Sequence, residues 1–337
     1  MKVLLSIFSV NEQILHIREN LQSLGCDVRY IDTDPYRQNC SYFAKKIDEI
    51  GIRCGRYKYL ERVHNKLYEI MNEFRPDVVF FINIPEGVLT IDDLIYIRKR
   101  SKSVCWFVDG ISNRPGIKGY LNAFDHIYVF EYKDVAYLNS MNFKGIYLPV
   151  GYNDVFRSAR NQEDIDIIFI GSPFHNRLEI LEKVARVSKK KQWILKVIGP
   201  FYDNRYPWKK IIFKRRYPYI YSCLENRRVS SKEAADLYSR TKICLNIHDY
   251  HHKSPNPRTF EILATGAFEL IDKRDNWGGL KPGIDLISFD NTIDLISKIE
   301  YYLKNNTKRC TIGRQGKQTV INAFRMKYLL NKIISSI

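Results

Sequence analysis

The stretch SPNPRTFEILATG, residues 254–266, places two charged side chains at the start of a short apolar helix. Free N–H groups and a partial positive charge make a helix N-terminus a site for anions. With Arg258 in its first turn, beside Asn256 and Thr259, this end suits a phosphate or diphosphate. Glu261 lies one turn deeper, where a carboxylate can accept two hydrogen bonds from the vicinal diol of a ribose. Phosphate beside ribose indicates a nucleotide.

The limits of this helix can be predicted from its ends. Asn256 is a good N-cap, Pro257 suits the first helical position, and Gly266 is placed to end the helix. At about 100° per residue, an apolar face is predicted for Phe260, Leu263, Ala264 and Ala267. The opposite face would carry Arg258, Glu261 and Thr265. A plain i,i+3 surface ion pair between Arg258 and Glu261 is an equally simple interpretation of this face.

Three further loops follow apolar segments that read as strands. Gly171, after IDIIFIG, permits close approach of the backbone, and Arg177 follows at the start of the next helix as a candidate phosphate ligand. Gly199, after LKVI, is expected to edge a pocket for the base. His248, with His251 and His252 close behind, lacks supporting ligands at metal spacing. We expect His248 to contact a sugar hydroxyl or a phosphate, with a solvated loop as the alternative.

The first half of the chain offers carboxylates at strand ends. Asp109 ends the segment CWFVD and could act as the general base that deprotonates an acceptor hydroxyl. An aspartate that begins a turn before Gly110 is the structural alternative. Glu86, in INIPEG, is a reserve candidate.

Continuous apolar runs alternate with helical patterns along the chain, which predicts an α/β fold with parallel sheets covered on both faces. The predicted strands are KVLLSIFSV, DVRYID, DVVFFINIP, SVCWFVDG, HIYVFE, GIYLPVG, IDIIFIGS, LKVIGPF, KICLNIH, AFELID and LISFD. The pattern restarts near residue 165, after a polar stretch without periodicity. Two doubly wound sheets are therefore expected, with ligands beyond the carboxyl ends of the strands.

The segment SPNPRTFEILATGAF, with the sequence that surrounds it between residues 165 and 325, resembles the C-terminal domain of CgeB-like glycosyltransferases. This resemblance implies a GT-B fold of two Rossmann-like domains, and metal-independent transfer from a nucleotide-sugar donor to a glycan or lipid-linked hydroxyl acceptor. It also implies that Glu261 binds the ribose and that Arg258 binds the diphosphate. Many retaining relatives carry a second glutamate eight positions upstream, where this chain has Lys253, which leaves retention or inversion open.

The domain limits that follow are 1–155 for an acceptor-side domain and 156–320 for the nucleotide-sugar domain. A C-terminal helix over 321–337 is expected to pack back on the first domain. We expect no bound cofactor and no metal, because the donor itself is the substrate.

Composition bounds the partners. The 337 residues carry a net charge of +17, which indicates an anionic partner unless it reflects a basic proteome. Seven cysteines without CxxC spacing suggest reduced thiols and a cytoplasmic protein. No apolar run approaches the ~18 residues of a membrane span.

The basic and aromatic run YPWKKIIFKRRYPYIY, residues 206–221, lacks the periodicity of an amphipathic helix and is expected to be an edge strand with a solvated basic face. Peripheral contact with an anionic membrane surface, to reach a lipid-linked acceptor of a bacterial surface glycan, is the first functional interpretation of the run. Two other functions remain open: a nucleic-acid-binding protein or DNA-modifying transferase, and a nucleotide-sugar binder without catalysis.

Overall fold

A computed structural model describes residues 1–6, 12–31, 54–83, 88–112, 115–157 and 160–337. The chain divides into two compact units, each with its own sheet. Unit 1 comprises residues 1–149 and 327–337, and unit 2 comprises residues 150–326. The sequence placed these limits at 155 and 320, a few residues away from those in the structure. No helix in the part of the chain described here is long and apolar enough to cross a membrane.

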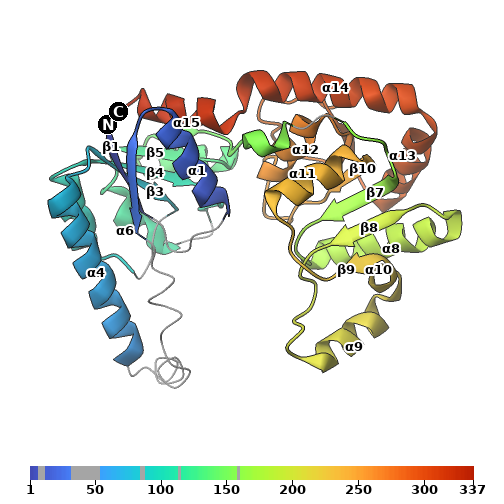
Figure 1. The fold of residues 1–337 in the computed structure, drawn as a ribbon, viewed down its shortest axis with the longest axis horizontal. Helices are drawn as coiled ribbons and strands as arrows, with labels where there is room; N and C mark the ends of the chain where they lie inside the picture. The colour runs from blue at the N-terminus through green and yellow to red at the C-terminus, as the bar shows by residue number, and fades with distance from the viewer. Residues whose placement is uncertain (7–11, 32–53, 84–87, 113–114, 158–159) are drawn as a thin grey trace. The chain divides into compact units, whose positions relative to one another are not determined.

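Unit 1 contains a parallel sheet in the order β2-β1-β3-β4-β5-β6 (Figure 1). Its strands are β1 Lys2–Ser6, β2 Asp27–Ile31, β3 Val78–Ile82, β4 Lys102–Phe107, β5 His126–Val129 and β6 Gly145–Tyr147. The helices are α1 Glu12–Ser23, α4 Cys54–Phe74, α5 Ile91–Arg98, α6 Lys118–Leu121, α7 Tyr132–Ser140 and α15 Met326–Ile334, with a 3-10 turn at Pro115–Ile117. Every residue of β3 is buried, as expected of a parallel strand with both faces covered.

The C-terminal segment of the chain belongs to unit 1, because residues 327–337 cluster with it. Leu330 and Ile333 of α15 are fully buried. The hydroxyl groups of Tyr128 on β5 and Ser336 lie 2.6 Å apart, and Lys327 Nζ donates to the carbonyl oxygen of Ser23 at the end of α1. The chain therefore returns to unit 1 after unit 2 is complete.

Unit 2 has a second parallel sheet, in the order β12-β11-β10-β7-β8-β9. Its strands are β7 Ile165–Ile170, β8 Leu195–Ile198, β9 Leu224–Glu225, β10 Thr241–Asn246, β11 Glu269–Asp272 and β12 Ile287–Phe289. The helices are α8 His175–Lys191, α9 Pro207–Arg216, α10 Pro218–Cys223, α11 Ser231–Ser239, α12 Pro257–Thr265, α13 Thr292–Lys304 and α14 Asn306–Ala323, and a 3-10 turn spans Asp154–Phe156.

The first strand of unit 2, β7, lies in the middle of its sheet, and the strand order reverses beside it. This is the Rossmann order, in which ligands bind at the switch point beyond the carboxyl ends of the strands. Helices cover both faces. Phe260 of α12 packs with Ile168 and Cys244 on one face, and Leu181 of α8 packs with Phe169 on the other (Figure 1). Helices α8 and α12 therefore begin at the switch point from opposite sides of the sheet.

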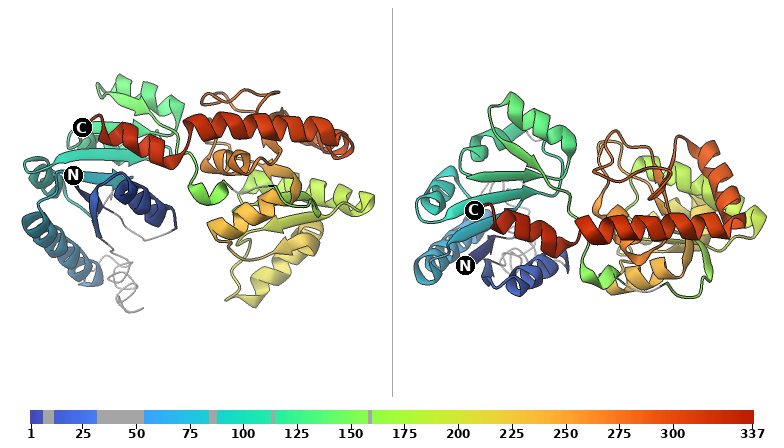
Figure 2. Two further views of the ribbon diagram at one scale, coloured as in Figure 1. Left: turned by 45° about the horizontal axis from the view of Figure 1, so that its top comes forward. Right: turned by 90° about the horizontal axis from the view of Figure 1, so that it is seen from above.

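Helix α14 runs along unit 2 beside α12, as both views of Figure 2 show. Two glycines allow this close approach. A Cβ at Gly313 would lie 2.5 Å from the carbonyl oxygen of Gly266, and one at Gly316 would lie 2.3 Å from that of Asp285. Any larger residue at either position would push α14 away from the end of α12.

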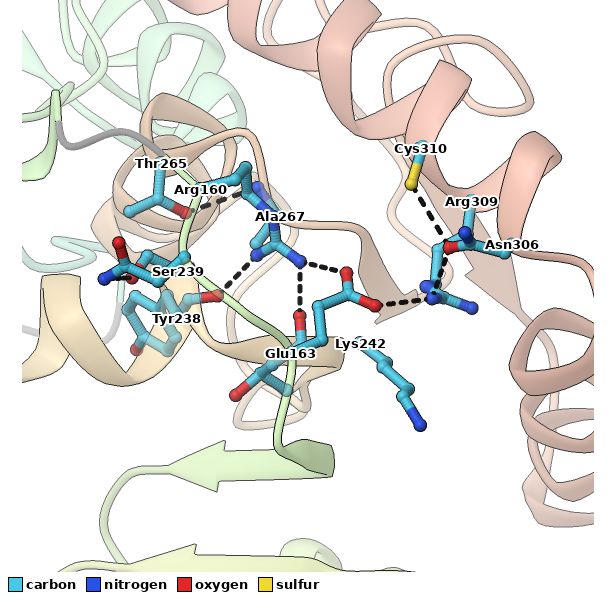
Figure 3. A network of polar contacts seen from close by, with 12 residues as sticks. Arg160, Glu163, Tyr238, Ser239, Lys242, Thr265, Ala267, Asn306, Arg309 and Cys310 are labelled. Carbon is cyan, nitrogen blue, oxygen red and sulfur yellow. Dashed lines mark hydrogen bonds and ion pairs between the residues drawn. The ribbon is translucent and has the colours of Figure 1, made fainter.

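The polar stretch before β7 is anchored by charged side chains (Figure 3). Arg160 donates to the carbonyl oxygens of Tyr238 and Thr241, at 2.7 and 2.8 Å, and also contacts Glu163. Glu163 in turn accepts from Arg309 Nη2 of α14 at 2.7 Å. This network ties the start of β7 to α14 and to the turn before β10. The stretch thus lacks periodicity because its contacts are polar.

The structure corrects the prediction for residues 206–221, which form the helices α9 and α10 rather than an edge strand. A proline occupies the first turn of each helix, where its missing N–H costs no hydrogen bond. Glu182 of α8 accepts from the backbone N–H groups of Tyr219 and Ile220, at 3.1 and 2.9 Å, which satisfies the start of α10. The two-residue strand β9 was not predicted either.

Candidate functional site

Helix α12 has the limits predicted from its sequence. The Asn256 side chain accepts from the backbone N–H of Thr259, Pro257 occupies the first turn, and Gly266 ends the helix with a φ of 79°. The predicted apolar face is buried, and Phe260 and Leu263 are fully inaccessible. Thr265 was assigned to the outer face and is instead fully buried. Its hydroxyl donates to the carbonyl oxygen of Ile262 and accepts from the backbone N–H of Ala267, the latter contact drawn in Figure 3. The exposed stripe is therefore confined to the first two turns.

A buried amide pair holds the N-cap in place. Asn246, the last residue of β10, and Asn256 exchange hydrogen bonds of 3.0 and 3.1 Å between their side-chain amides. The Asn246 amide also lies 3.0 Å from the Thr259 hydroxyl and 2.8 Å from Glu269 Oε1. Thr259 is fully buried and its hydroxyl faces this polar cluster. The Thr259 hydroxyl therefore contacts Asn246, and the predicted part of Thr259 in nucleotide-sugar binding remains a prediction.

His248 lies in a buried structural position, and its predicted contact with a sugar hydroxyl or a phosphate remains a prediction. Its side chain is fully buried, Nε2 accepts from the backbone N–H of Asn256 at 3.0 Å, and Nδ1 lies 2.8 Å from Asp272 Oδ1. These partners require the neutral tautomer with its proton on Nδ1. Burial lowers the pKa of His248, which keeps the ring neutral. Both ring nitrogens are used, so His248 orients the loop before α12.

Arg258 lies in the first turn of α12, beside the turn that follows β7. Its Nη1 would be 3.3 Å from a Cβ at Gly171, and its buried Nε has no hydrogen-bond partner in the described structure. A Cβ at Gly171 would also approach the Phe169 ring to 2.9 Å. Glycine at position 171 therefore leaves room for the Arg258 guanidinium, as its predicted role in close approach requires.

Arg177 reaches the same turn from the other face of the sheet. It lies in the first turn of α8, is only 8% exposed, and donates to the carbonyl oxygens of Ile247 and Ser172, the latter at 3.0 Å. Burial and the nearby charge of Arg258 lower the pKa of Arg177 to about 10. Two guanidinium groups are thus held close together at the switch point, and an anion bound there would relieve their repulsion.

Glu261 lies one turn beyond Arg258 and is half-buried. Both charges act electrostatically on the buried Tyr238 hydroxyl of α11, whose pKa is raised chiefly by burial. Lys253, at the position where retaining relatives were said to carry a glutamate, pairs instead with Asp275 at 3.3 Å.

Gly199 packs against the turn that carries Gly171. A Cβ at position 199 would lie 2.0 Å from the Gly171 carbonyl oxygen, and the Gly171 N–H donates to Ile198 at 2.9 Å. The ends of β7 and β8 can meet only because residue 199 has no side chain. Gly199 therefore shapes the turn that faces Arg258, and its predicted place at the edge of a base pocket remains a prediction.

The acidic residues beneath the site were missed by the sequence analysis. Glu269 is fully buried, and its Oε2 has no hydrogen-bond partner in the part of the chain described here. Burial raises the pKa of Glu269 to about 8, which keeps the carboxyl group protonated near neutral pH. The signal was present in the sequence: Asn246 and Glu269 are polar residues inside the apolar segments KICLNIH and AFELID.

The candidate carboxylate of unit 1 follows β4. Asp109 is exposed, and its Oδ2 accepts from the Asn83 side chain at 3.2 Å. Asn83 follows β3 with a φ of 61°, so both residues lie at the carboxyl edge of the sheet of unit 1. The buried Asp134 accepts from the backbone N–H groups of Ile111 and Ser112, which fixes the turn after Asp109. The reserve candidate Glu86 lies outside the described residues.

Unit 2 is similar to a known protein family. Residues 177–335 match the family model described as glycosyl transferase-like, and no curated protein matches the chain significantly. The matched residues include most of unit 2, and the chain as a whole has the GT-B fold, with two parallel six-stranded sheets covered by helices. Among the described residues, no group of three or more His, Cys, Asp or Glu side chains is arranged to hold a metal ion.

Solved structures share the whole fold at low sequence identity. A glycosyltransferase from Rickettsia africae is 15% identical with a TM-score of 0.69, and the match covers 99% of this chain and 97% of the other. Sucrose-phosphate synthase from Thermosynechococcus elongatus is 13% identical with a TM-score of 0.72, covering 99% and 98%. Anabaena HepE in complex with UDP and glucose is 10% identical with a TM-score of 0.67, covering 100% and 99%.

Proposed function

We propose that the protein transfers a sugar from a nucleoside diphosphate sugar to a hydroxyl acceptor, with the donor diphosphate at the N-terminus of α12. The observation that carries this proposal is the convergence of two guanidinium groups, Arg258 and Arg177, on the turn at Gly171. The polar cluster of Asn246, Asn256 and His248 holds this entrance rigidly. Glu261, one turn deeper, is the proposed ligand of the ribose hydroxyls.

The proposed chemistry follows from the charges. The leaving group is a nucleoside diphosphate, and Arg258, Arg177 and the dipole of α12 would stabilise its developing negative charge. HepE is described in complex with UDP-glucose, so UDP-sugars are the first donors to test. We propose that the acceptor is a bacterial surface glycan or glycolipid and that the protein attaches peripherally to the inner face of the membrane. We also propose, from the motif NPRTFE, that it belongs to the CgeB-like subtype.

A thermal-shift screen tests the donor site. UDP, ADP, GDP and dTDP, each alone and as its glucose conjugate, are added to the purified protein. A ligand at a hundred times its Kd stabilises the native state by about 2.7 kcal/mol, so we expect one base to raise the Tm by several degrees. The matching nucleoside should have little effect, because it lacks the diphosphate. A flat response to every nucleotide and nucleotide sugar would contradict the proposal.

Asp109 is the proposed general base of the acceptor side. Asp109→Asn keeps the size of the side chain but removes its basicity, so we expect the turnover number to fall at least about tenfold while donor affinity stays unchanged. The measurement is initial transfer rate against donor concentration with an acceptor in excess. If the turnover number were unchanged, Asp109 would not be the general base, and its role would be to form the turn before Gly110.

A further inference from the structure

Helix α9 presents an unusual surface at the margin of unit 2 (Figure 1). Of its ten residues, only Phe213 is buried. Three large apolar side chains are exposed to solvent instead: Trp208 by 57%, Ile211 by 66% and Ile212 by 60%. Apolar side chains gathered in this way on one short helix mark an interaction surface.

The apolar side chains form a stripe bordered by positive charge. At about 100° per residue, Trp208, Ile211 and Ile212 share one side of α9, opposite Phe213. A pair of basic residues flanks each side of this stripe: Lys210 with Lys214 on one side and Lys209 with Arg216 on the other. Arg215 lies within the stripe. Long basic side chains beside an exposed apolar stripe are typical of helices that lie in a membrane interface.

The positive charge of α9 is offset only slightly by its surroundings, since Asp203, the acidic residue near Lys209, already pairs with Arg205. Residues 204–224 contain no acidic residue. The five basic residues of α9 make no ion pair within the described structure. Two of the lysine side chains lie over aromatic rings: Lys209 Nζ is 4.6 Å from the centre of the Tyr206 ring, and Lys214 Nζ is 5.4 Å from that of Tyr221. An anionic surface would supply the missing counter-charge.

A recess beneath α9 adds a place for a polar headgroup. A pocket of about 710 Å³ lies between α9 and the loop after β8. Its lining includes Lys209, Ile212 and Arg216 of α9, together with Tyr202, Asn226 and Asp203, whose carboxylate pairs with Arg205. Lys209 and Arg216 supply two cations for a phosphate, whereas the Asn226 amide is already hydrogen-bonded to the backbone of Phe201 and Tyr202 and to Asn204. The apolar stripe and this recess share Ile212.

We propose that α9 docks the protein on an anionic phospholipid surface, with Trp208, Ile211 and Ile212 inserted among the acyl chains and the flanking cations on the lipid phosphates. A nucleic acid would use the cations and Trp208, but it offers nothing to the two isoleucines. Docking through α9 would bring the enzyme to a lipid-linked acceptor, and this consequence rests on the proposed function. Membrane binding itself does not depend on it.

Vesicle co-sedimentation of the full chain, without donor, tests the proposal. Vesicles of phosphatidylcholine alone are compared with vesicles that contain roughly 30% phosphatidylglycerol, which imitate an anionic membrane. We expect binding only to the anionic vesicles and a blue shift of Trp208 fluorescence, which Trp208→Phe should abolish. Removing three cations by K210A, K214A and R215A together should weaken binding on the order of a hundredfold.

Two matched variants separate α9 from general basicity. Removing three exposed cations of α8 by K183A, R186A and K190A changes the net charge equally and should weaken binding far less. Ile211→Ser with Ile212→Ser should weaken vesicle binding without changing the net charge. Three results would each overturn the proposal. They are absence of vesicle binding, equal losses of binding in the α8 and α9 charge variants, and DNA binding that is stronger than vesicle binding and does not change when the two isoleucines are replaced. Because no donor is added, these results are independent of nucleotide binding.

Discussion

Arg258→Ala is expected to weaken binding of the nucleoside diphosphate about tenfold to a hundredfold or more, because it removes charge-assisted hydrogen bonds worth roughly 1.5–3 kcal/mol. Its effect on folding should have the opposite sign. The Nε of Arg258 is buried without a partner in the described residues, and its charge lowers the pKa of Arg177. Removing Arg258 relieves this repulsion, so the Tm of the ligand-free variant should stay the same or rise.

Glu261→Ala is expected to cause a loss of similar size through another part of the ligand. If Glu261 binds the ribose, the variant should lose affinity for UDP but keep its affinity for inorganic pyrophosphate. Arg258→Ala should lose affinity for both. Calorimetric titration of the two variants with the two ligands measures this difference directly.

Lys253→Ala is the matched control, because it removes a cation from the loop just before α12 that already pairs with the exposed Asp275. We expect it to bind UDP as the wild type does. If Arg258→Ala and Glu261→Ala both bound UDP with wild-type affinity, the donor site would not lie at α12. Equal losses of UDP affinity in all three variants would show that the loss does not depend on the position of the substituted residue.

Glu269→Gln is expected to abolish a decline in stability between about pH 5 and pH 8. The unfolded carboxyl group has a pKa near 4.5, and burial raises the folded value to about 8. Between these values the folded chain binds one proton more than the unfolded chain, so stability falls as pH rises. At about 1.4 kcal/mol per pH unit, the wild type would lose roughly 4 kcal/mol between pH 5 and pH 8.

Glutamine keeps the oxygen that accepts from Asn246 and cannot ionise. Near pH 5 the variant should match the wild type to within about 1 kcal/mol, and its advantage should grow up to pH 8. Urea unfolding at each pH unit measures both proteins. Glu179→Gln, at an exposed position of α8, should leave the profile unchanged. A constant difference between Glu269→Gln and the wild type across the window would show that Glu269 is ionised in the native state.

Local sequence was sufficient for the framework of the site. All eleven predicted strands are present, since each is a run of apolar residues long enough to cross a sheet that is buried on both faces. The cap at Asn256 and the stop at Gly266 were equally predictable, because capping depends on residues three or four positions apart. Arg258 and Glu261 followed directly from the helix that these two residues define.

Side-chain partners from distant segments could not be predicted in the same way. For His248 the sequence suggested a contact with a sugar hydroxyl or a phosphate, but not its place between Asp272 and the backbone of Asn256. Only the pairing of β10 with β11 brings these groups together. Residues 206–221 lacked a helical pattern because α9 buries only Phe213. A periodic signal requires a buried face, and α9 has almost none.

By itself the sequence determined two α/β units, the limits of α12 and the charges at its N-terminus, because strands, helices and caps depend on neighbours along the chain. Tertiary structure alone decided that Arg177 would join Arg258 at the turn of Gly171, that Glu269 would be buried below them, and that α9 would remain uncovered. Each of these outcomes depends on which strand ends meet at the switch point, and strand order is set by packing between segments far apart in the sequence.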